Sequence, residues 1–338
     1  MKKFIVFIFL VFLITGCKGS TEKNIIKNLD KKISSSSSYK LDGKLEIYRN
    51  EEIYTYDIES SYEKGEKYMV KLVNRNNNHE QIILKNEEGI YVLTPSLNKS
   101  FKFQSDWPNN NSQIYLLQPI LNDIKSDSKA LVEKNEKNYI INSKVNYSTE
   151  KDFVKQKVYV DSKNNVTKIE ILDAKDNVKM SMEIIDLQYN TKFDDNYFDV
   201  NSYISTNSNE NTLEENNKSE VTDSSSLKID EIVYPMYIPT DTFLSSQNVV
   251  ETDDGERAIL TFSGESSFTV VQETLHNDDT LQYVYGDPYL ILDTIGSITD
   301  SSVSWISNGI EYSVVSENLD SEELLTVAQS ITVQSVGK

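Results

Sequence analysis

Cys17 is the residue whose chemistry its surroundings specify most closely. It is the only cysteine among 338 residues, so the chain cannot close an internal disulfide. Lys2 and Lys3 precede an unbroken apolar run from residue 4 to residue 14, and Thr15-Gly16 places small residues directly before Cys17. A basic start, a short apolar run and a small-residue cleavage site are typical of a secretory signal. The run is shorter than the about 20 residues that span a bilayer, so the sequence predicts a signal peptide over residues 1–16.

The position of Cys17 also resembles the lipobox of bacterial lipoproteins. The resemblance implies that the thiol is diacylglycerated, with acyl chains such as palmitate, and that Cys17 becomes the first residue of a chain anchored to the extracytoplasmic face of the cell membrane, the forespore envelope included. Residues 17–24 then form a lipidated polar tether. The alternative is an ordinary signal peptide followed by a chance cysteine. An acylated Cys17 leaves no thiol for catalysis.

Other side chains offer little catalytic chemistry. His79 and His276 are the only histidines and fall in different predicted domains, without identifiable partners for a metal site or a catalytic triad. Adjacent carboxylates such as Asp194-Asp195 and Asp253-Asp254 fit solvated turns better than an acid–base pair. Asp194, Asp195 and Asp199 lack the alternating spacing and glycine of a calcium loop. We therefore expect no enzyme activity, no catalytic residue, no metal and no cofactor.

The charge balance narrows the class of partner. The chain has 34 Lys and Arg against 53 Asp and Glu, a formal net charge of −19. This balance argues against nucleic acid, whose phosphates are bound by Lys and Arg. It also argues against electrostatic docking on anionic lipid. Attachment to the membrane is therefore expected through the acylated Cys17, and the remaining candidate partners are an envelope protein or a lipid acyl chain.

Aromatic side chains recur along the first half of the chain and suggest a binding groove. On a curved sheet, inward rings are able to line a groove for an acyl chain or for the apolar segment of a partner. The alternative is plain core packing, which we also expect for Trp107 and Trp305. The candidate groove-lining residues are Tyr54, Tyr56, Tyr68, Tyr91, Phe101, Phe103 and Tyr115.

The elements that would position these rings follow from the hydrophobic period. Ile25, Ile26, Leu29 and Ile33 share one face of a helix. Ile114, Leu117, Leu121 and Ile124 predict a second helix, with a start at residues 109–112 and a kink or restart at Pro119. Alternation between and after the helices predicts antiparallel strands, at Tyr39–Arg49, Ile53–Ser61, Tyr68–Val73, Gln81–Leu84, Gly89–Leu93, Lys99–Phe103, Leu131–Glu133, Asn138–Asn142, Lys144–Ser148, Lys155–Asp161, Val166–Leu172 and Lys179–Gln188.

A polar stretch divides the chain into two predicted domains, residues 25–201 and 229–338. Residues 202–228 are almost all Asn, Ser, Glu, Asp, Lys and Thr, which predicts an acidic disordered linker that lets the domains move independently. In the second domain the sequence predicts a closing helix with Asp320 as its N-cap. The predicted strands of this domain are Arg257–Phe262, Ser267–Gln272, Leu281–Tyr285, Tyr289–Thr294, Ser302–Ile306 and Ile310–Ser316, the last two joined by an Asn308-Gly309 turn.

Several segments of the first domain resemble the LolA/RseB-type fold. They are Ser38–Leu45, Gly89–Pro95, Val158–Asp161 and, most closely, Ile184–Val200. The resemblance implies an incomplete, curved antiparallel β-barrel with covering helices. With the second domain, the expected fold class is mainly β with α (α+β): a LolA-like half-barrel followed by a small α+β domain.

The second domain resembles the DUF4367-type module, on the residues Tyr234–Pro239, Ser304–Tyr312 and Ser321–Ile331. A lipobox, a LolA-like domain and this module together resemble the YdcC-type sporulation lipoproteins, and the lipobox and first domain resemble the GerS-type germination lipoproteins. The resemblance implies a role in sporulation or germination through binding an envelope protein, a cortex peptidoglycan amidase in the GerS-type case. The alternative is a carrier of lipid or lipoprotein, or an RseB-like envelope sensor, that uses the concave groove.

Overall fold

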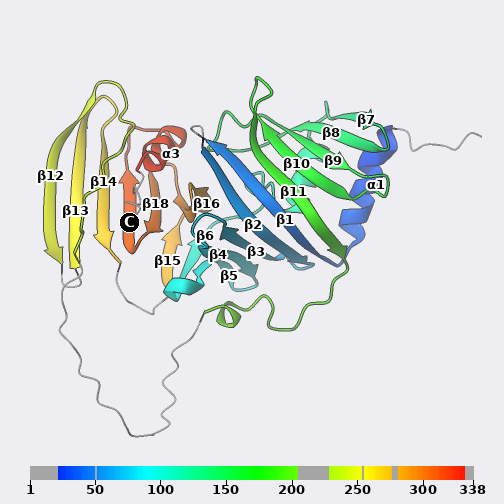
Figure 1. Cartoon of the computed structure of the whole chain (residues 1–338), viewed down its shortest axis with the longest axis horizontal. Coiled ribbons are helices and arrows are strands. Elements are labelled where there is room, and N and C mark those ends of the chain that lie inside the picture. Colours follow the sequence, from blue (N-terminus) through cyan, green and yellow to red (C-terminus); the bar gives the residue numbers. More distant parts are fainter. Residues whose placement is uncertain (1–21, 50–51, 205–227, 253–254, 276–280, 332–338) are drawn as a thin grey trace, which may run out of the picture.

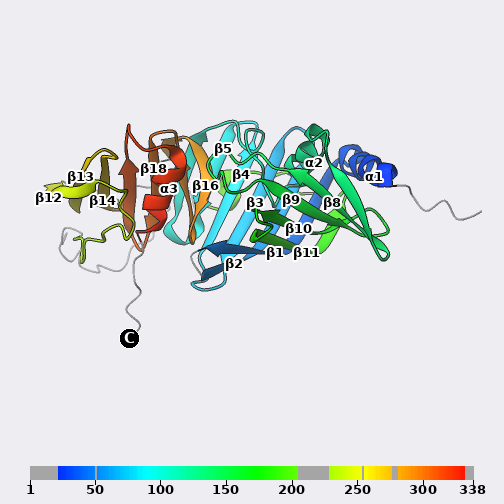
Figure 2. The same cartoon turned by 90° about the horizontal axis from the view of Figure 1, so that it is seen from above.

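The computed structural model describes residues 22–49, 52–204, 228–252, 255–275 and 281–331. Two β-sheets lie one after the other along the long axis of the molecule, with helix α1 at one end and strand β12 at the other (Figures 1 and 2). The prediction of a mainly β chain with a few helices is therefore confirmed. The predicted signal peptide, Cys17 and most of the tether fall outside the described residues, as does most of the predicted linker.

The first sheet has twelve strands in the order β15-β6-β5-β4-β3-β2-β1-β11-β10-β9-β8-β7. Its two outer strands do not pair with each other, so the barrel is not closed. Helices α1 (Glu22–Ser35) and α2 (Leu117–Ser126) lie on its inner face (Figure 2). The strands are β1 (Ser38–Arg49), β2 (Glu52–Glu63), β3 (Lys67–Asn74), β4 (Glu80–Asn86), β5 (Gly89–Thr94), β6 (Lys99–Gln104), β7 (Leu131–Asn135), β8 (Asn138–Lys144), β9 (Lys155–Val160), β10 (Val166–Leu172), β11 (Val178–Tyr189) and β15 (Gln282–Tyr285).

The main core fills the inner face of this sheet. The alternating residues of the strands bury one side chain in two there, and the apolar face of α1 is buried through Ile25, Leu29 and Ile33. Pro119 lies in the first turn of α2, where a missing amide N–H costs no helical hydrogen bond. The helix thus begins at Leu117 rather than at residues 109–112 as predicted.

A smaller core lies on the opposite face. Met69, Leu84 and Leu93 point there from β3, β4 and β5. The segment that follows β11 crosses over them, and Phe193 stacks on Tyr197 with ring centroids 4.4 Å apart. Burial on both faces explains why each of these three strands contains a run of consecutive apolar residues, Tyr68–Val70 in β3, Ile82–Leu84 in β4 and Ile90–Leu93 in β5.

The second sheet has seven strands in the order β12-β13-β14-β19-β18-β17-β16, with α3 (Ser321–Gln329) packed against β16, β18 and β19. Asp320 is the N-cap of α3, since its carboxylate accepts the Glu323 amide at 3.0 Å. Asn308 and Gly309 have φ of 50° and 76° in the predicted hairpin turn. The strands are β12 (Thr242–Thr252), β13 (Gly255–Gly264), β14 (Phe268–Thr274), β16 (Asp287–Ile291), β17 (Thr294–Ile298), β18 (Ser302–Ser307) and β19 (Ile310–Val315).

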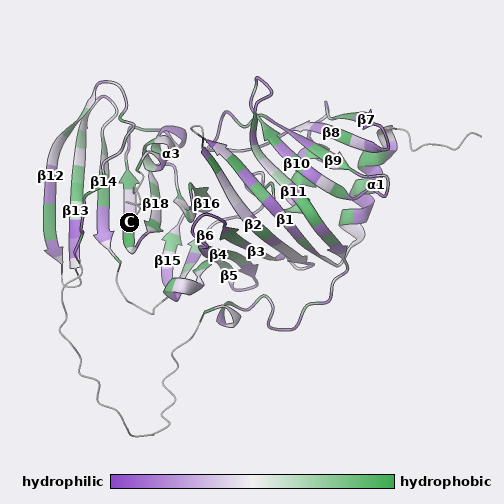
Figure 3. Ribbon diagram, viewed as in Figure 1, coloured by the Kyte–Doolittle hydropathy of each residue, from purple (hydrophilic) through white to green (hydrophobic). Residues whose placement is uncertain are grey.

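Three predictions about elements are wrong. Lys144–Ser148 is not a strand beyond Lys144, because Tyr147 leaves the sheet and packs edge-on against Phe153 at 5.2 Å. The predicted segment Tyr289–Thr294 is two strands, β16 and β17, divided by a turn at Leu292 and Asp293. Strand β12 was not predicted at all. Its residues are exposed on both faces, so no hydrophobic alternation marks it (Figure 3).

The two sheets are joined by a shared strand, whereas the sequence predicts halves that move independently. Strand β15 follows β14 in the chain but pairs in parallel with β6 of the first sheet, with Val284 opposite Phe103. Ile295 of β17 belongs to the core of the first sheet. Because β15 belongs to the second half of the chain and is the outer strand of the first sheet, the two halves share a sheet and cannot rotate freely about the linker.

Candidate functional site

The structure divides the predicted groove residues between two faces of the first sheet. Tyr56, Tyr68, Phe103 and Tyr115 lie in the main core on the inner face, and Tyr54 and Phe101 pack against that core while half-buried. Tyr91 is on the opposite face, in the smaller core. The seven residues therefore do not line one groove.

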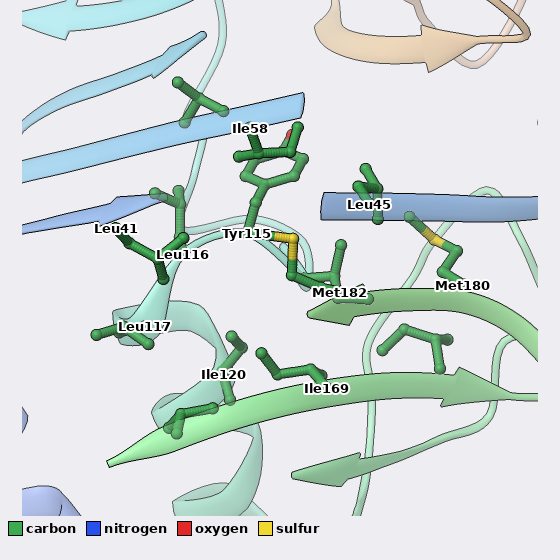
Figure 4. Close-up of a cluster of buried hydrophobic side chains, with 14 of the residues drawn as sticks. Leu41, Leu45, Ile58, Tyr115, Leu116, Leu117, Ile120, Ile169, Met180 and Met182 are labelled. Carbon is green, nitrogen blue, oxygen red and sulfur yellow. The ribbon is translucent and has the colours of Figure 1, made fainter. Parts of the chain in front are cut away.

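The inner face of the first sheet is filled rather than open. Tyr115, in the segment before α2, points toward Met182 of the sheet, and Ile120 of α2 points toward Ile169 (Figure 4). Trp107 is completely buried and meets Tyr68 edge-on at 6.0 Å. A cavity of about 60 Å³ remains beside Tyr54 and Tyr115. It holds only a few water molecules, at about 10–15 Å³ of such space for each.

A larger pocket lies where the two sheets meet. Its volume is about 330 Å³, which lies at the lower end of the range for small-ligand sites, about 300–1,000 Å³. The apolar part of its lining comes from both halves: Val92, Phe101 and Phe103 of β5 and β6, Val284 of β15, Ile295 of β17, and Trp305 and Ile306 of β18. We call this the junction pocket. Two of the seven predicted groove residues, Phe101 and Phe103, lie in it.

Gln81 positions the two walls of the junction pocket. Its amide oxygen accepts the Ile295 amide at 2.6 Å and the Thr294 hydroxyl at 3.2 Å. Its amide nitrogen donates to the Thr94 hydroxyl at 3.3 Å. Gln81 is buried, so these bonds between β4 and β17 form away from water, where an unmade bond is costly.

A buried charge network holds the sheets together on the other side of the junction. Arg49, the last residue of β1, pairs with Glu150 and also donates to the side chain of Gln329 in α3. Tyr289 of β16 donates to the same Glu150 carboxylate at 2.9 Å. Burial and the Glu150 charge raise the pKa of Tyr289 well above its ordinary value, so Tyr289 stays a neutral donor at physiological pH.

The polar lining of the junction pocket is mostly uncharged. The polar groups of its lining are amides, hydroxyls and the Glu311 carboxylate, with neither histidine nor cysteine among them. Within the described ranges no group of three or more His, Cys, Asp or Glu residues is placed to hold a metal ion. His79 lies on the junction near Asp293, and burial lowers its pKa. Cys17 and His276 fall outside the described residues.

The pocket residues that come from the second half of the chain were not predicted from the sequence. Trp305 was expected to be a packing residue, and it does stack on Tyr312 with ring centroids 5.2 Å apart, yet its edge also lines the pocket. The parallel pairing of β15 with β6 brings these walls together. A contact between residues about 180 positions apart leaves no local signal in the sequence.

The chain is thus a two-sheet β protein with a partly apolar pocket at the junction of its halves. No protein-family model matches the chain. The sporulation protein YdcC of Bacillus subtilis strain 168 is 33% identical over 328 residues, which cover 96% of this chain and 94% of that protein. The chain therefore belongs to the YdcC family of sporulation proteins.

Two solved structures are among the similar folds. The MucA/MucB complex of Pseudomonas aeruginosa contains a chain with 12% identity and a TM-score of 0.33, over 91% of this chain and 98% of that one. The complex of the CwlD amidase with the GerS lipoprotein of Clostridioides difficile contains a chain with 19% identity and a TM-score of 0.31, over 52% of this chain and 99% of that one. No helix in the described part of this chain is long and apolar enough to cross a membrane.

Proposed function

We propose that this protein is a membrane-anchored, extracytoplasmic lipoprotein that serves sporulation or germination by binding another protein of the envelope, and that it is not an enzyme. The observation that carries the proposal is the junction pocket, which combines an apolar wall with fixed polar groups and is held by polar contacts on both sides. Preformed apolar pockets with a few fixed polar groups are the usual form of a recognition site. Membership of the YdcC family supports the link to sporulation.

The anchor in this proposal is Cys17. The lipobox-like sequence supports acylation at Cys17, and the two or three acyl chains of a bacterial lipoprotein hold a chain firmly where one alone would not. Helix α1 begins at Glu22, so the anchor lies a few residues from the end of the molecule opposite β12 (Figure 1). The partner class we favour is a cortex peptidoglycan amidase, as the GerS-type resemblance implies.

The test is a pull-down of the full chain from sporulating cells, with bound proteins and lipids both identified by mass spectrometry. A Phe101→Glu variant puts a charge on the half-buried wall of the junction pocket. Ile185→Glu is the matched control, since Ile185 is exposed on β11 and does not line the pocket. We expect an envelope protein to be captured with the parent chain and with Ile185→Glu, and to be lost with Phe101→Glu.

Two results would contradict the proposal. A stoichiometric lipid without a protein would assign the pocket to an acyl chain, the ligand of the alternative carrier or sensor function. Equal capture by both glutamate variants would show that the junction pocket is not where the partner binds. A Cys17→Ala variant tests the anchor in the same cells, because it should leave the membrane fraction.

A further inference from the structure

The two sheets have four outer strands, and one of them differs from the rest. Strand β7 is five residues long and carries Glu133 and Lys134. Strand β15 has four residues, and its last carbonyl, of Tyr285, accepts the Ser297 hydroxyl at 2.5 Å. Strand β16 contains Pro288 and packs against the first sheet. Short, charged, proline-containing or covered edges are the usual protection against unwanted strand pairing.

Strand β12 has almost none of this protection. It is eleven residues long, and its sequence, Thr242 to Thr252, contains no Lys, Arg or Pro. Its outer edge has no partner among the described residues, and it forms the free end of the molecule (Figures 1 and 2). One bulge interrupts the pairing, at Ser245, and Ser246–Thr252 then pairs with β13 without a break. A regular stretch of free backbone N–H and C=O groups is therefore open to solvent.

Apolar side chains flank this open edge on both faces. Leu244 and Val249 lie opposite Phe262 and Ala258 of β13, on the face of the second core, and are 39% and 52% exposed. Phe243 and Val250 are on the other face and are 62% and 48% exposed. An open edge with apolar residues on both sides suits an added strand, which gains main-chain hydrogen bonds and side-chain contacts together.

The segment that enters the second sheet extends the apolar surface beside β12. Tyr234 donates to the side chain of Gln247 at 2.5 Å, which places its ring next to the strand. Tyr234 is itself 43% exposed, so its ring adds an open aromatic surface beside the strand.

The charges around β12 indicate what kind of strand it takes. Asp241 precedes the strand, Glu251 is near its end, and Glu256 is opposite Glu251. Arg257 is the one cation on β12 and β13, and Glu273 neutralises it with two hydrogen bonds of 2.7 and 2.9 Å. Both ends of the edge are therefore acidic and its middle is apolar. A second copy of this chain fits poorly, since each copy has a formal net charge of −19.

We propose that the outer edge of β12 is a docking site for an extended segment of another polypeptide, apolar in its middle and basic at its ends, which adds to the second sheet as an eighth strand. This site is separate from the junction pocket and does not depend on the function proposed for it. It faces away from the end of the molecule that carries α1 and the predicted anchor (Figure 1).

The test uses the full chain and a synthetic peptide that alternates threonine and valine over about nine residues, with two lysines at each end. Hydrogen exchange followed by mass spectrometry should show slower exchange of the amides of residues 242–252 when the peptide is added. The same peptide with N-methylated central amides keeps its side chains but loses its main-chain donors. We expect it to bind at least tenfold more weakly, on the order of the loss of one or two hydrogen bonds.

A pair of matched variants separates the edge from general surface effects. Val249→Lys places a cation on the open edge, whereas Val315→Lys does so on β19, which has β14 and β18 on its two sides. Both valines are exposed, at 52% and 44%, so both variants should fold. We expect Val249→Lys to weaken peptide binding about fivefold, the size of one cross-strand pair, and Val315→Lys to leave it unchanged.

Four outcomes would overturn the proposal. Unchanged exchange over residues 242–252 would show that the peptide does not dock there. Equal affinity for the N-methylated peptide, or an equal loss with both lysine variants, would mean that no strand is added. A dimer in sedimentation with residues 242–252 protected in the absence of peptide would assign the edge to a second copy of the chain. If the pull-down from sporulating cells failed, the peptide experiments would still stand, because they test the edge of β12 and not the junction pocket.

Discussion

At the scale of single residues, the structure contains a carboxylate that burial holds in its protonated form to higher pH than usual. Asp123, on α2, accepts a hydrogen bond from the Ser112 hydroxyl at 2.7 Å. Burial raises its pKa from 3.8 to about 6, although the Ser112 bond acts in the opposite direction. Ser112 in turn accepts the Asn146 amide at 2.6 Å, so Asp123 supports the loop that closes the main core.

The pH dependence of stability follows from this shift. The folded state binds the Asp123 proton more tightly than the unfolded state, so its contribution to stability is complete below about pH 4 and is lost as the pH rises through about 6. Asp123→Asn keeps an acceptor for Ser112 and removes the charge. We expect the variant to be more stable than the parent at pH 7.5, by about 1–2 kcal/mol after allowing for solvent screening, and equally stable at pH 4.

Urea unfolding at pH 4 to 7.5 measures this difference, and Asp127→Asn is the control at the end of the same helix. The Asp127 carboxylate accepts the amides of Lys129 and Lys144, which lower its pKa. The stabilisation from Asp127 is present above its ordinary pKa of 3.8 and is lost only as the pH falls below it. The control should therefore be less stable than the parent by a nearly constant amount across the higher pH values, with no change near pH 6. Parallel pH curves for the parent and Asp123→Asn would show that Asp123 is not the titrating group.

At the scale of elements, the close approach of β1 to β11 depends on a glycine. The pairing of these strands shifts register between Asp42 and Gly43. A Cβ at Gly43 would lie 2.5 Å from the Glu183 carbonyl oxygen and 2.6 Å from the terminal carbon of Met182. The bulge thus brings the two backbones closer together than any other residue allows.

Gly43→Ala should lower the free energy of unfolding by about 1–3 kcal/mol, the usual cost of overpacking. Gly309→Asn is the control, because nothing lies within 4 Å of a Cβ there and its φ of 76° suits asparagine. The control should lose less than about 1 kcal/mol. Thermal unfolding of both variants measures the difference. If Gly43→Ala were as stable as the control, then β1 and β11 would be able to move apart without a loss of stability.

The sequence predicts those elements that bury one face and fails for those that do not. The paired strands β1 and β2 were recognised from alternation, and α3 from Asp320 and its buried stripe. Strand β12 has no buried face and left no period to detect. Tyr91 was grouped with Tyr56 and Phe103 because all are aromatic, but the period of two along β5 sends it to the opposite face, where it lies with Leu93. The candidate site was predicted only as far as Phe101 and Phe103.

At the scale of the whole molecule, the junction makes one body of the two halves. Besides β15, the sheets share the Gln81 bonds on one side and the Arg49–Glu150–Tyr289 network on the other. Buried polar contacts of this kind are specific, since each leaves an unpaired group when it opens. The junction pocket therefore exists only while the halves stay docked, and the same holds for the positions of α1 at one end of the molecule and β12 at the other (Figure 1).

Docking of this strength should survive a cut in the chain. A protease site placed within residues 205–227 interrupts the connection between the halves without touching the described junction. We expect the cleaved protein to elute from a gel-filtration column as one species, because β15 stays paired with β6.

Arg49→Ala should weaken the association of the two fragments, since removing one partner of a buried ion pair costs about 3–5 kcal/mol. Arg75→Ala is the matched control, as its pair with Asp57 is about half exposed and lies away from the junction network, and exposed ion pairs contribute little to stability. Separate elution of the two fragments of the parent protein would instead support two independent domains, with a junction pocket that opens and closes.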